Sequence, residues 1–329
     1  MPITTFSLSL CARVTMDMHS LNNEGTEGNQ QQTRMVHIID QNGNRAVVNA
    51  ISGDMFKRIL VGHLVPLLEE QGQPLCEPAR RMDPDRITAD INFQGAAKNH
   101  KGSNSELLTI LLKSCSLTDM AGALFVDEAL PRKSCVEFGW VVGLPADGAG
   151  QPLTTTEQYF HVKYAADRGA AAGGDTTVGK QPIFHRPASS GVYALICNLD
   201  VYRVGLNDIT REYVVDGGDR KKRARALIHA LAASLVKPSG AQRNTQNPHI
   251  VACEGIVATS GSSLPAPTVS PLNDNYRDQM DQVARELNRI QPDTIRATRF
   301  ETLADGVRIL ADNAAELEPP AGRAVAAAK

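Results

Sequence analysis

The chain has 329 residues, of which 42% are hydrophobic and 21% charged, and its formal net charge is −2. This composition is typical of a folded globular protein and excludes a protein whose whole surface is basic. No run of about 18 consecutive apolar residues is present, so a membrane-spanning helix is not predicted. Residues 1–14 lack the basic start and cleavage site of a secretory signal. We therefore expect a cytoplasmic protein in which any contact with phosphates depends on local clusters of cations.

The cysteines are scattered and form no C-x-x-C pair, and none has a nearby histidine at zinc-finger spacing. The pattern predicts reduced, mostly buried thiols and no metal site. The six positions are Cys11, Cys76, Cys115, Cys135, Cys197 and Cys253.

Residues 6–17 alternate between apolar and mainly polar side chains, with Arg13 on the polar side. The alternation predicts a half-buried strand in an antiparallel sheet whose second, polar face is open. Residues 18–34 are predicted to form a long excursion from the core, because this segment is too polar to pack. Its amides and its cation either contact sugars and bases or simply solvate a loop; they include Asn22, Asn23, Gln32 and Arg34.

A hairpin and a helix follow this excursion. Strand-like segments at 35–39 and 46–48 flank a turn that contains Asn42-Gly43, and this dipeptide supplies the positive φ angles of a tight hairpin. A helix is predicted to begin after Ser52, which is a good N-cap. Pro66 should kink or shorten the helix, since it removes one backbone donor.

The start of this helix is a candidate anion site. Its unpaired N–H groups can bind a phosphate, Gly53 permits close approach, and Lys57 and Arg58 add charge one turn later. The alternative is a capped helix, with Ser52 as the cap, whose lysine and arginine are merely solvated.

In the middle of the chain, residues 72–104 are predicted to be irregular, and a capping box from Ser103 to Glu106 opens another helix. Residues 135–142 are predicted to form a strand, and residues 148–190 a mobile hairpin that projects from the body. Further predicted elements are a strand at 192–204, a helix at about 219–236, a strand at 249–258, a Pro/Ser-rich linker at 264–271, two amphipathic helices through 276–290 and 300–310, and a fraying tail at 319–329. The order strand, helix, strand, strand, helix, strand indicates a ferredoxin-like α+β core of the RNA-recognition type with insertions.

Three further groups of residues could bind nucleic acid. On the projecting hairpin, aromatic rings alternate with cations, which suits wedging between bases; the alternative is that the rings anchor the hairpin. The basic run 220–225 opens a helix and needs a compensating partner, either solvent and nearby carboxylates or an RNA or protein contact. The loop 237–245 carries donors suited to phosphate and ribose oxygens. The hairpin and loop residues are Phe160, His161, Lys163, Phe184, His185, Arg186, Lys237, Gln242, Arg243 and Asn244.

Catalytic residues are not apparent in the sequence. No nucleophile has a matching base, and no paired carboxylates or metal ligands emerge. Asp83 and Asp85 fit a turn. His19, with Asp17 and Glu24 nearby, matches no hydrolytic site. We therefore expect a protein that is not an enzyme and needs no cofactor.

Four segments resemble the DevR family of CRISPR-associated backbone subunits, within the RAMP superfamily. The likeness runs in order from about residue 6 to residue 258, and the second and fourth segments are the more specific. The segments are FSLSLCARVTMDMHSLNNEGTEGN, NAISGDMFKRIL, CSLTDMAGALF with RKSCVEFGWVVG, and QPIFHRPASSGVYALICNLDVYRVG.

The resemblance implies a hand-shaped, modified RNA-recognition fold in residues 1–258. A helical insertion would span about 72–130 and a thumb hairpin about 151–190. The predicted amphipathic helices and tail make residues 272–329 a helical extension, which the resemblance does not cover. The resemblance also implies a subunit of a type I Cascade that lines up with copies of itself and other subunits along a crRNA. The subunit would hold the RNA backbone and leave the spacer bases free for a target DNA strand.

The same resemblance, together with the residue patterns described above, predicts which residues hold the RNA. They lie at the first strand and loop, the start of the first helix, the thumb and the closing loop. The set is Arg13, Asn22, Asn23, Gln32, Arg34, Ser52, Gly53, Lys57, Arg58, His161, Lys163, Phe184, Arg186, Lys237, Gln242, Arg243 and Asn244.

Two alternatives stay open at this point. One is a metal-dependent endoribonuclease of the same superfold that uses Asp17 or His19, with Glu24 and Glu27 nearby. The other is a DNA-binding transcriptional autoregulator, which would need a helix that reads base edges.

Overall fold

The computed structural model describes residues 3–99, 102–125, 129–147, 150–162, 183–240 and 244–321. The strands are β1 (Ile3–Thr4), β2 (Ser7–His19), β3 (Asn23–Glu27), β4 (Gln30–Thr33), β5 (Met35–Ile39), β6 (Arg45–Ile51), β7 (Ala123–Phe125), β8 (Leu130–Arg132), β9 (Val136–Phe138), β10 (Val141–Gly143), β11 (Thr154–Val162), β12 (Ile183–Leu199), β13 (His249–Ser260), β14 (Ile295–Phe300) and β15 (Leu317–Glu318).

The helices begin where the sequence provides caps. Ser52 caps the first long helix by accepting a hydrogen bond from the Met55 N–H, and the predicted capping box from Ser103 to Glu106 is present. None of the helices in the described ranges is long and apolar enough to cross a membrane. The helices are α1 (Gly53–Glu70), α2 (Glu77–Arg80), the 3-10 turn η1 (Arg86–Ala89), α3 (Ile91–Asn99), α4 (Asn104–Ser114), α5 (Ser116–Ala121), the 3-10 turn η2 (Val201–Arg203), α6 (Gly217–Val236), α7 (Tyr276–Ile290) and α8 (Leu303–Glu316).

The central sheet confirms the predicted α+β class with a ferredoxin-like core. Its strands lie in the order β14-β13-β2-β12-β10-β6-β5, and each neighbouring pair is antiparallel. The core elements follow one another as β2, α1, β9 with β10, β12, α6 and β13. Since β12 lies between β2 and β10, this arrangement is the split β-α-β unit of ferredoxin-like folds.

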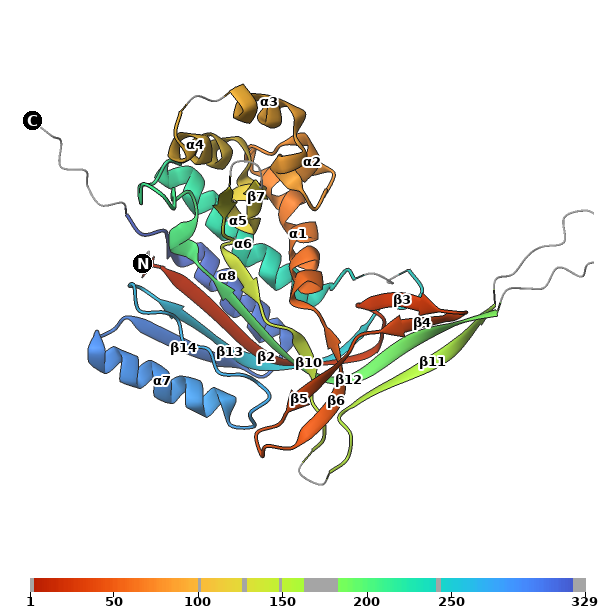
Figure 1. The fold of residues 1–329 in the computed structure, drawn as a ribbon. Coiled ribbons are helices and arrows are strands. Elements are labelled where there is room, and N and C mark those ends of the chain that lie inside the picture. The colour runs from red at the N-terminus through yellow and green to blue at the C-terminus, as the bar shows by residue number, and fades with distance from the viewer. Residues whose placement is uncertain are drawn as a thin grey trace, which may run out of the picture.

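The main hydrophobic core lies between this sheet and the helices α1, α6 and α8, which stand on one side of it (Figure 1). From α1 the core takes the predicted stripe, including Phe56, Ile59 and Leu64. Pro66 does not shorten α1, because the helix continues to Glu70.

The other face of the sheet is covered, so the prediction of an open polar face on the first strand is wrong. Ser9 and Cys11 are fully buried. Cys11 packs with Ala266, Tyr276 and Met280, which come from the Pro/Ser-rich segment and from α7. Residues 264–271 therefore cover the sheet rather than link two parts of the chain, and α7 lies below β13 and β14 in Figure 1.

Arg13 holds this cover in place. Its guanidinium donates to the Pro271 carbonyl at 2.9 Å and forms an ion pair with Asp274 at 2.8 Å. Gln41, in the turn between β5 and β6, also hydrogen-bonds Asp274. The side chain of Arg13 is thus engaged within the chain. This geometry does not support the predicted contact of Arg13 with RNA.

The polar segment 18–34 is not an unpacked excursion. It forms the hairpin of β3 and β4, and His19, Ser20 and Leu21 before it are buried. The hairpin leans on the projecting strands: Gln158 donates to the Gln31 carbonyl, and β4 bridges to β12. The segment has few apolar residues, and backbone hydrogen bonds in the hairpin stabilise it instead.

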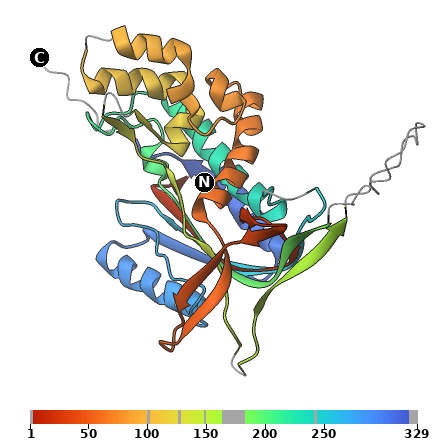
Figure 2. The same ribbon diagram turned by 45° about the vertical axis from the view of Figure 1, so that its right-hand side comes forward.

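The projecting hairpin is present as β11 and β12, which pair from Thr154–Gly191 out to Val162–Ile183 and extend away from the helices (Figure 2). Its tip, residues 163–182, lies outside the described residues. The strand predicted at 192–204 is the second half of β12, which ends at Leu199 and is followed by η2. The strand predicted at 135–142 is broken into β9 and β10 at Gly139 and Trp140.

Residues 72–104, predicted to be irregular, include the short helices α2, η1 and α3. With α4 and α5 they form the helical insertion at the top of Figure 1. The helices α2 and η1 have only four residues each, which is too short for a helical period to show in the sequence.

The C-terminal segment contains a strand that the sequence did not reveal. Of the two predicted helices, α7 matches its predicted range, whereas the second, α8, begins only at Leu303. Between them β14 pairs with β13 and extends the central sheet. The boundaries of the predicted domains stay predictions.

Candidate nucleic-acid interface

The start of α1 is fixed by contacts within the chain. The Ser52 N–H donates to the Asn22 side-chain oxygen at 2.8 Å, and Asn22 is only 8% exposed. A Cβ on Gly53 would lie 2.6 Å from the Phe138 carbonyl oxygen. Gly53 is therefore needed for α1 to pack closely against β9, and Asn22 ties the loop after β2 to the same point. These two predicted site residues position the interface.

Three cations gather along α1 and the segment that follows it, and we call Lys57, Arg58 and Arg86 the α1 cation cluster. Arg58 donates to the Met82 carbonyl, and Arg86 donates to the Gly122 carbonyl at 2.8 Å. Among the described residues, Lys57 has no hydrogen bond or ion pair. Burial and then the charge of Arg86 lower the pKa of Lys57, and burial and then Arg58 lower the pKa of Arg86.

The cluster therefore holds mutually repelling, partly desolvated positive charges. The carboxylates of Asp54, Glu137 and Asp85 attract them from a distance, but none among the described residues forms an ion pair with the cluster. Desolvated like charges are unfavourable unless an anion joins them. Arg86 was not among the residues predicted from the sequence. It lies 28 positions after Arg58, in a turn where its own φ is 51°, and nothing local marks it.

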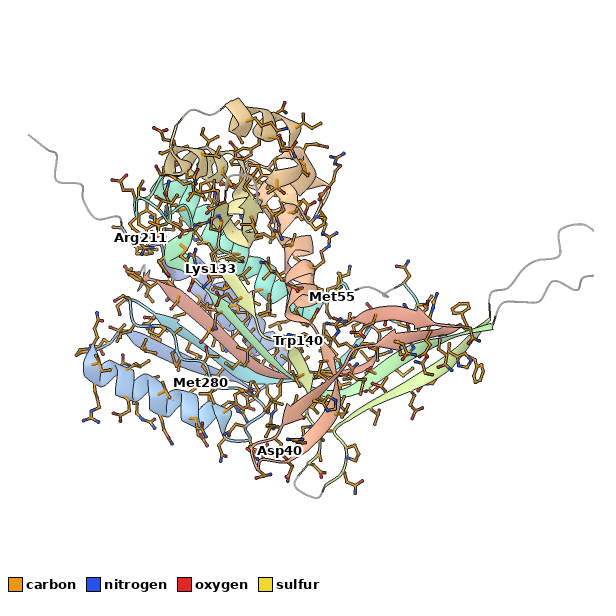
Figure 3. The ribbon with its side chains drawn as sticks, in the orientation of Figure 1. Asp40, Met55, Lys133, Trp140, Arg211 and Met280 are labelled. Carbon is orange, nitrogen blue, oxygen red and sulfur yellow. The ribbon has the colours of Figure 1, made fainter. Side chains whose placement is uncertain are left out.

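An exposed aromatic ring lies beside the start of α1. Trp140 is 44% exposed, and the guanidinium of Arg34 lies over its ring at 5.2 Å from the centroid. Arg34 also pairs with Glu24. Figure 3 shows Trp140 and Met55, from the first turn of α1, near the line where α1 meets the sheet. The sequence analysis missed Trp140, although it is the single tryptophan of the chain and follows a glycine at a break between two short strands.

The projecting hairpin of β11 and β12, for which we keep the name thumb, carries aromatic and basic side chains on both faces. Phe160 is 74% exposed and contacts His185, with ring centroids 4.4 Å apart. On the other face His161 stacks on Phe184, and Arg186 lies over the Phe184 ring at 4.7 Å. Phe160 thus does not anchor the hairpin to the core. Lys163, also predicted here, lies outside the described residues.

A cleft of about 340 Å³ lies between the thumb and the turn of the β3–β4 hairpin. Phe184, His185 and Arg186 line one side of it, and Asn29 and Gln31 line the other. Gln32 is half-buried on β4, and Asn23 accepts a hydrogen bond from the Ser20 hydroxyl.

The loop after α6 lies at the base of the thumb. His63 hydrogen-bonds the Lys237 carbonyl, Gly240 packs against Leu21, and Arg186 contacts the Thr245 hydroxyl at 3.4 Å. Lys237 and Asn244 are exposed, while Gln242 and Arg243 lie outside the described residues. The loop thus runs from α6, beside His63 of α1, toward the thumb.

A family model described as "CRISPR-associated negative auto-regulator DevR/Csa2" matches residues 10–281. The chain belongs to this family. No curated protein matches the sequence.

Solved structures give a weaker likeness. One, described as "CRISPR RNA-guided surveillance complex, pre-nicking", shares 9% identity, with 94% of this chain and 100% of that chain covered, at a TM-score of 0.49. Another, described as "CRISPR RNA-guided surveillance complex", shares 10% identity over 89% of this chain and 88% of that chain, at a TM-score of 0.41. At these TM-scores neither likeness supports a functional conclusion.

The basic run 220–225 of this DevR/Csa2-family chain is largely used inside the fold. Arg223 is 1% exposed and pairs with Asp119 at 2.8 Å, while Arg220 donates to the Val204 and Pro320 carbonyls. Lys221 pairs with Glu318, and Arg225 donates to the Ala315 carbonyl. The sequence analysis offered two interpretations of this run, a solvated basic face and a contact with RNA or protein. Neither fits Arg220 and Arg223, because both arginines are buried.

His19 and Glu24, which were weighed for catalysis, each have another partner in the structure. Burial lowers the pKa of His19 from 6.5 to about 4, and its ring packs on Tyr193. Glu24 is paired with Arg34. Across the part of the chain that the structure describes, no three His, Cys, Asp or Glu side chains are grouped to hold a metal ion.

Proposed function

We propose that this DevR/Csa2-family chain is the non-catalytic backbone subunit of a type I CRISPR surveillance complex. Copies of the chain would line up along a crRNA, hold its backbone and leave the spacer bases free to pair with a target DNA strand. Other Cascade subunits would complete the assembly.

The α1 cation cluster is the observation that carries this proposal. Lys57, Arg58 and Arg86 form no ion pair with a carboxylate among the described residues, and they share the α1 side of the molecule with the exposed ring of Trp140. A single-stranded nucleic acid supplies phosphates for such cations and base faces for such a ring. A duplex offers the phosphates but keeps its base faces stacked.

Binding of this kind is expected to depend little on sequence. The exposed groups are cations, aromatic faces and backbone amides, which contact phosphates and π-faces rather than base edges. The net charge of −2 is compatible with this role, because each copy needs only a few phosphate contacts and linkage along one RNA multiplies weak single-site binding.

The test is to purify the tagged full-length chain from its native host and sequence the nucleic acid that accompanies it. We expect RNAs of uniform length that carry repeat sequence at their ends, together with companion proteins. Protein that is free of RNA, or that carries duplex DNA fragments, would count against the backbone role.

The family's description as a negative auto-regulator favours a second candidate, an auto-regulator that binds DNA. Competition separates the two roles. For a backbone subunit, only unlabelled single-stranded competitor should displace labelled single-stranded RNA from the chain. A regulator would instead bind one operator duplex more tightly than random duplex.

The proposed absence of catalysis has its own test. Labelled RNA incubated with the chain and Mg²⁺ or Mn²⁺ should stay intact. Cleavage that disappears in Asp17→Ala or His19→Ala would instead support the endoribonuclease.

A further inference from the structure

Two cysteines that are far apart in the sequence meet in the helical insertion. The Sγ atoms of Cys76 and Cys115 lie 3.3 Å apart, although the residues are 39 positions apart. Cys76 precedes α2, and Cys115 is the junction residue between α4 and α5. All six cysteines lie in the described residues, and among these no other two have their sulfur atoms in hydrogen-bond contact.

The pair differs chemically from the remaining cysteines. Burial raises the pKa of Cys11, Cys135, Cys197 and Cys253, which keeps those thiols protonated and unreactive. In the pair, the hydrogen bond that Cys76 donates lowers the pKa of Cys115, and contacts with Thr118 lower it further, whereas the same hydrogen bond and burial raise the pKa of Cys76. The resting pair therefore holds its proton on Cys76 and its negative charge on Cys115. Arg86 lies within electrostatic reach of Cys115. A thiolate shared within such a positive environment is a reactive one.

The pair is also reachable. Cys76 is partly exposed, whereas Cys115 is fully buried behind it. A small oxidant can therefore reach Cys76, and the sulfur that resolves the oxidised product already touches it.

We propose that Cys76 and Cys115 are a redox modification site, where a hydroperoxide converts the two thiols to an intramolecular disulfide. In the resting pair the shared proton sits on Cys76; when it moves along the hydrogen bond to Cys115, the partly exposed Cys76 becomes the thiolate and attacks the peroxide, whose O–O bond breaks. This step gives the sulfenic acid of Cys76 and a hydroxide ion that takes up a proton as water. Cys115 then attacks Cys76, the S–S bond forms, and the S–O bond breaks to release a second water. The sulfurs lose two electrons, and the peroxide gains them.

The disulfide would bear on the α1 cation cluster. Residues 77–89 begin directly after Cys76 and include Arg86, which lies near both sulfurs. Closing the link from Cys76 to Cys115 would fix the start of this segment against the junction of α4 and α5. The proposal is independent of the RNA role, because its test needs no nucleic acid.

Trypsin makes the test simple, since it places each thiol alone in one peptide, residues 59–80 for Cys76 and 114–132 for Cys115. The purified full-length chain is treated with hydrogen peroxide at a concentration that fully oxidises free cysteine in the same buffer. Remaining thiols are alkylated in denaturant, and the digest is analysed by mass spectrometry without reductant. We expect the two peptides joined with loss of two hydrogen atoms, and separated again by dithiothreitol.

Matched variants complete the design. Cys76→Ser and Cys115→Ser should each abolish the linked peptide, while Cys253→Ser, at a buried thiol on β13, should retain it. Circular dichroism checks that each variant is folded. Two outcomes overturn the proposal: both thiols still alkylated after peroxide, or a sulfinic or sulfonic acid on one sulfur with the other left free.

Discussion

Two long helices on the same side of the sheet, α1 and α6, both carry basic residues near their starts, but they use them in opposite ways. In α6 the guanidinium of Arg223 reaches Asp119, Gln73 and the Leu112 carbonyl, and it is almost fully buried. In α1 the ammonium of Lys57 has no such partner among the described residues. One start stabilises the fold, and the other leaves positive charge for a ligand.

The comparison shows that the partner, rather than the charge, decides what a basic helix start does. Cations at the positive end of a helix are unfavourable unless compensated. For α6 the compensation comes from Asp119, which also pairs with Arg132 at 2.7 Å and accepts the Gly205 N–H. We call Asp119 with Arg132 and Arg223 the Asp119 network; it joins α5, β8 and α6.

The largest expected effect tests the buried side of the comparison. Asp119→Asn removes the carboxylate from between two guanidinium groups, leaving Arg223 buried without a counter-charge and Arg132 with Asp208 as its remaining carboxylate partner. Breaking a buried ion pair in this way costs about 3–5 kcal/mol. Urea unfolding followed by circular dichroism should show a loss of this size with an unchanged m-value.

Glu286→Gln is the matched control for that measurement. Glu286 is paired with Arg289 on the surface of α7, where its side chain is 66% exposed. An exposed pair of this kind contributes about 0–1 kcal/mol. Equal losses in the two variants would show that the Asp119 network is no more important than a surface pair.

The next effect concerns the aromatic ring beside the open charges. Trp140→Ala should weaken binding of single-stranded RNA by about 1–3 kcal/mol, because stacking on one base is lost. The salt dependence should stay as it is, since no phosphate contact changes. Fluorescence anisotropy at several salt concentrations measures both quantities. Trp140→Phe should recover much of the affinity, and if it does not, stacking is the wrong explanation.

A smaller effect is expected from Lys57→Ala. Losing one phosphate contact should reduce affinity by about tenfold or less for every RNA sequence. The slope of log affinity against log salt should become shallower by about 0.7, the value for one phosphate of a single strand. An unchanged slope would remove Lys57 from the list of phosphate contacts.

Much of the fold follows from local patterns in the sequence. Alternating apolar residues predicted β2, and the Asn42-Gly43 turn predicted the hairpin of β5 and β6. Ser52 and Ser103 predicted where α1 and α4 begin. These signals are local, so they survive in a single sequence. The burial of Ser9 could not be predicted in this way, because Pro267 and α7, which cover that strand, lie more than 250 residues later.

The candidate site was predictable only in part, for the same reason. Lys57 and Arg58 follow a recognisable N-cap. A turn brings Arg86 to them, and a break between two strands exposes Trp140 nearby, and neither arrangement has a local signal in the sequence. The arginines of α6 looked like equally good candidates, since their partner Asp119 is 104 positions away from Arg223. A sequence shows which charges exist and hides which of them are already paired.

The smallest expected effect is therefore the most direct test of the comparison. Lys222→Ala makes the same change of charge on a helix as Lys57→Ala, but Lys222 lies 3.4 Å from the carboxylate of Asp219 and is 56% exposed. We expect RNA affinity and its salt slope to stay at the wild-type values, measured beside Lys57→Ala in the same titration. If the two variants weaken RNA binding equally, the chain senses only total charge, and the distinction between the two helix starts fails. If Lys57→Ala alone does so, the absence of an intramolecular partner is what marks the interface.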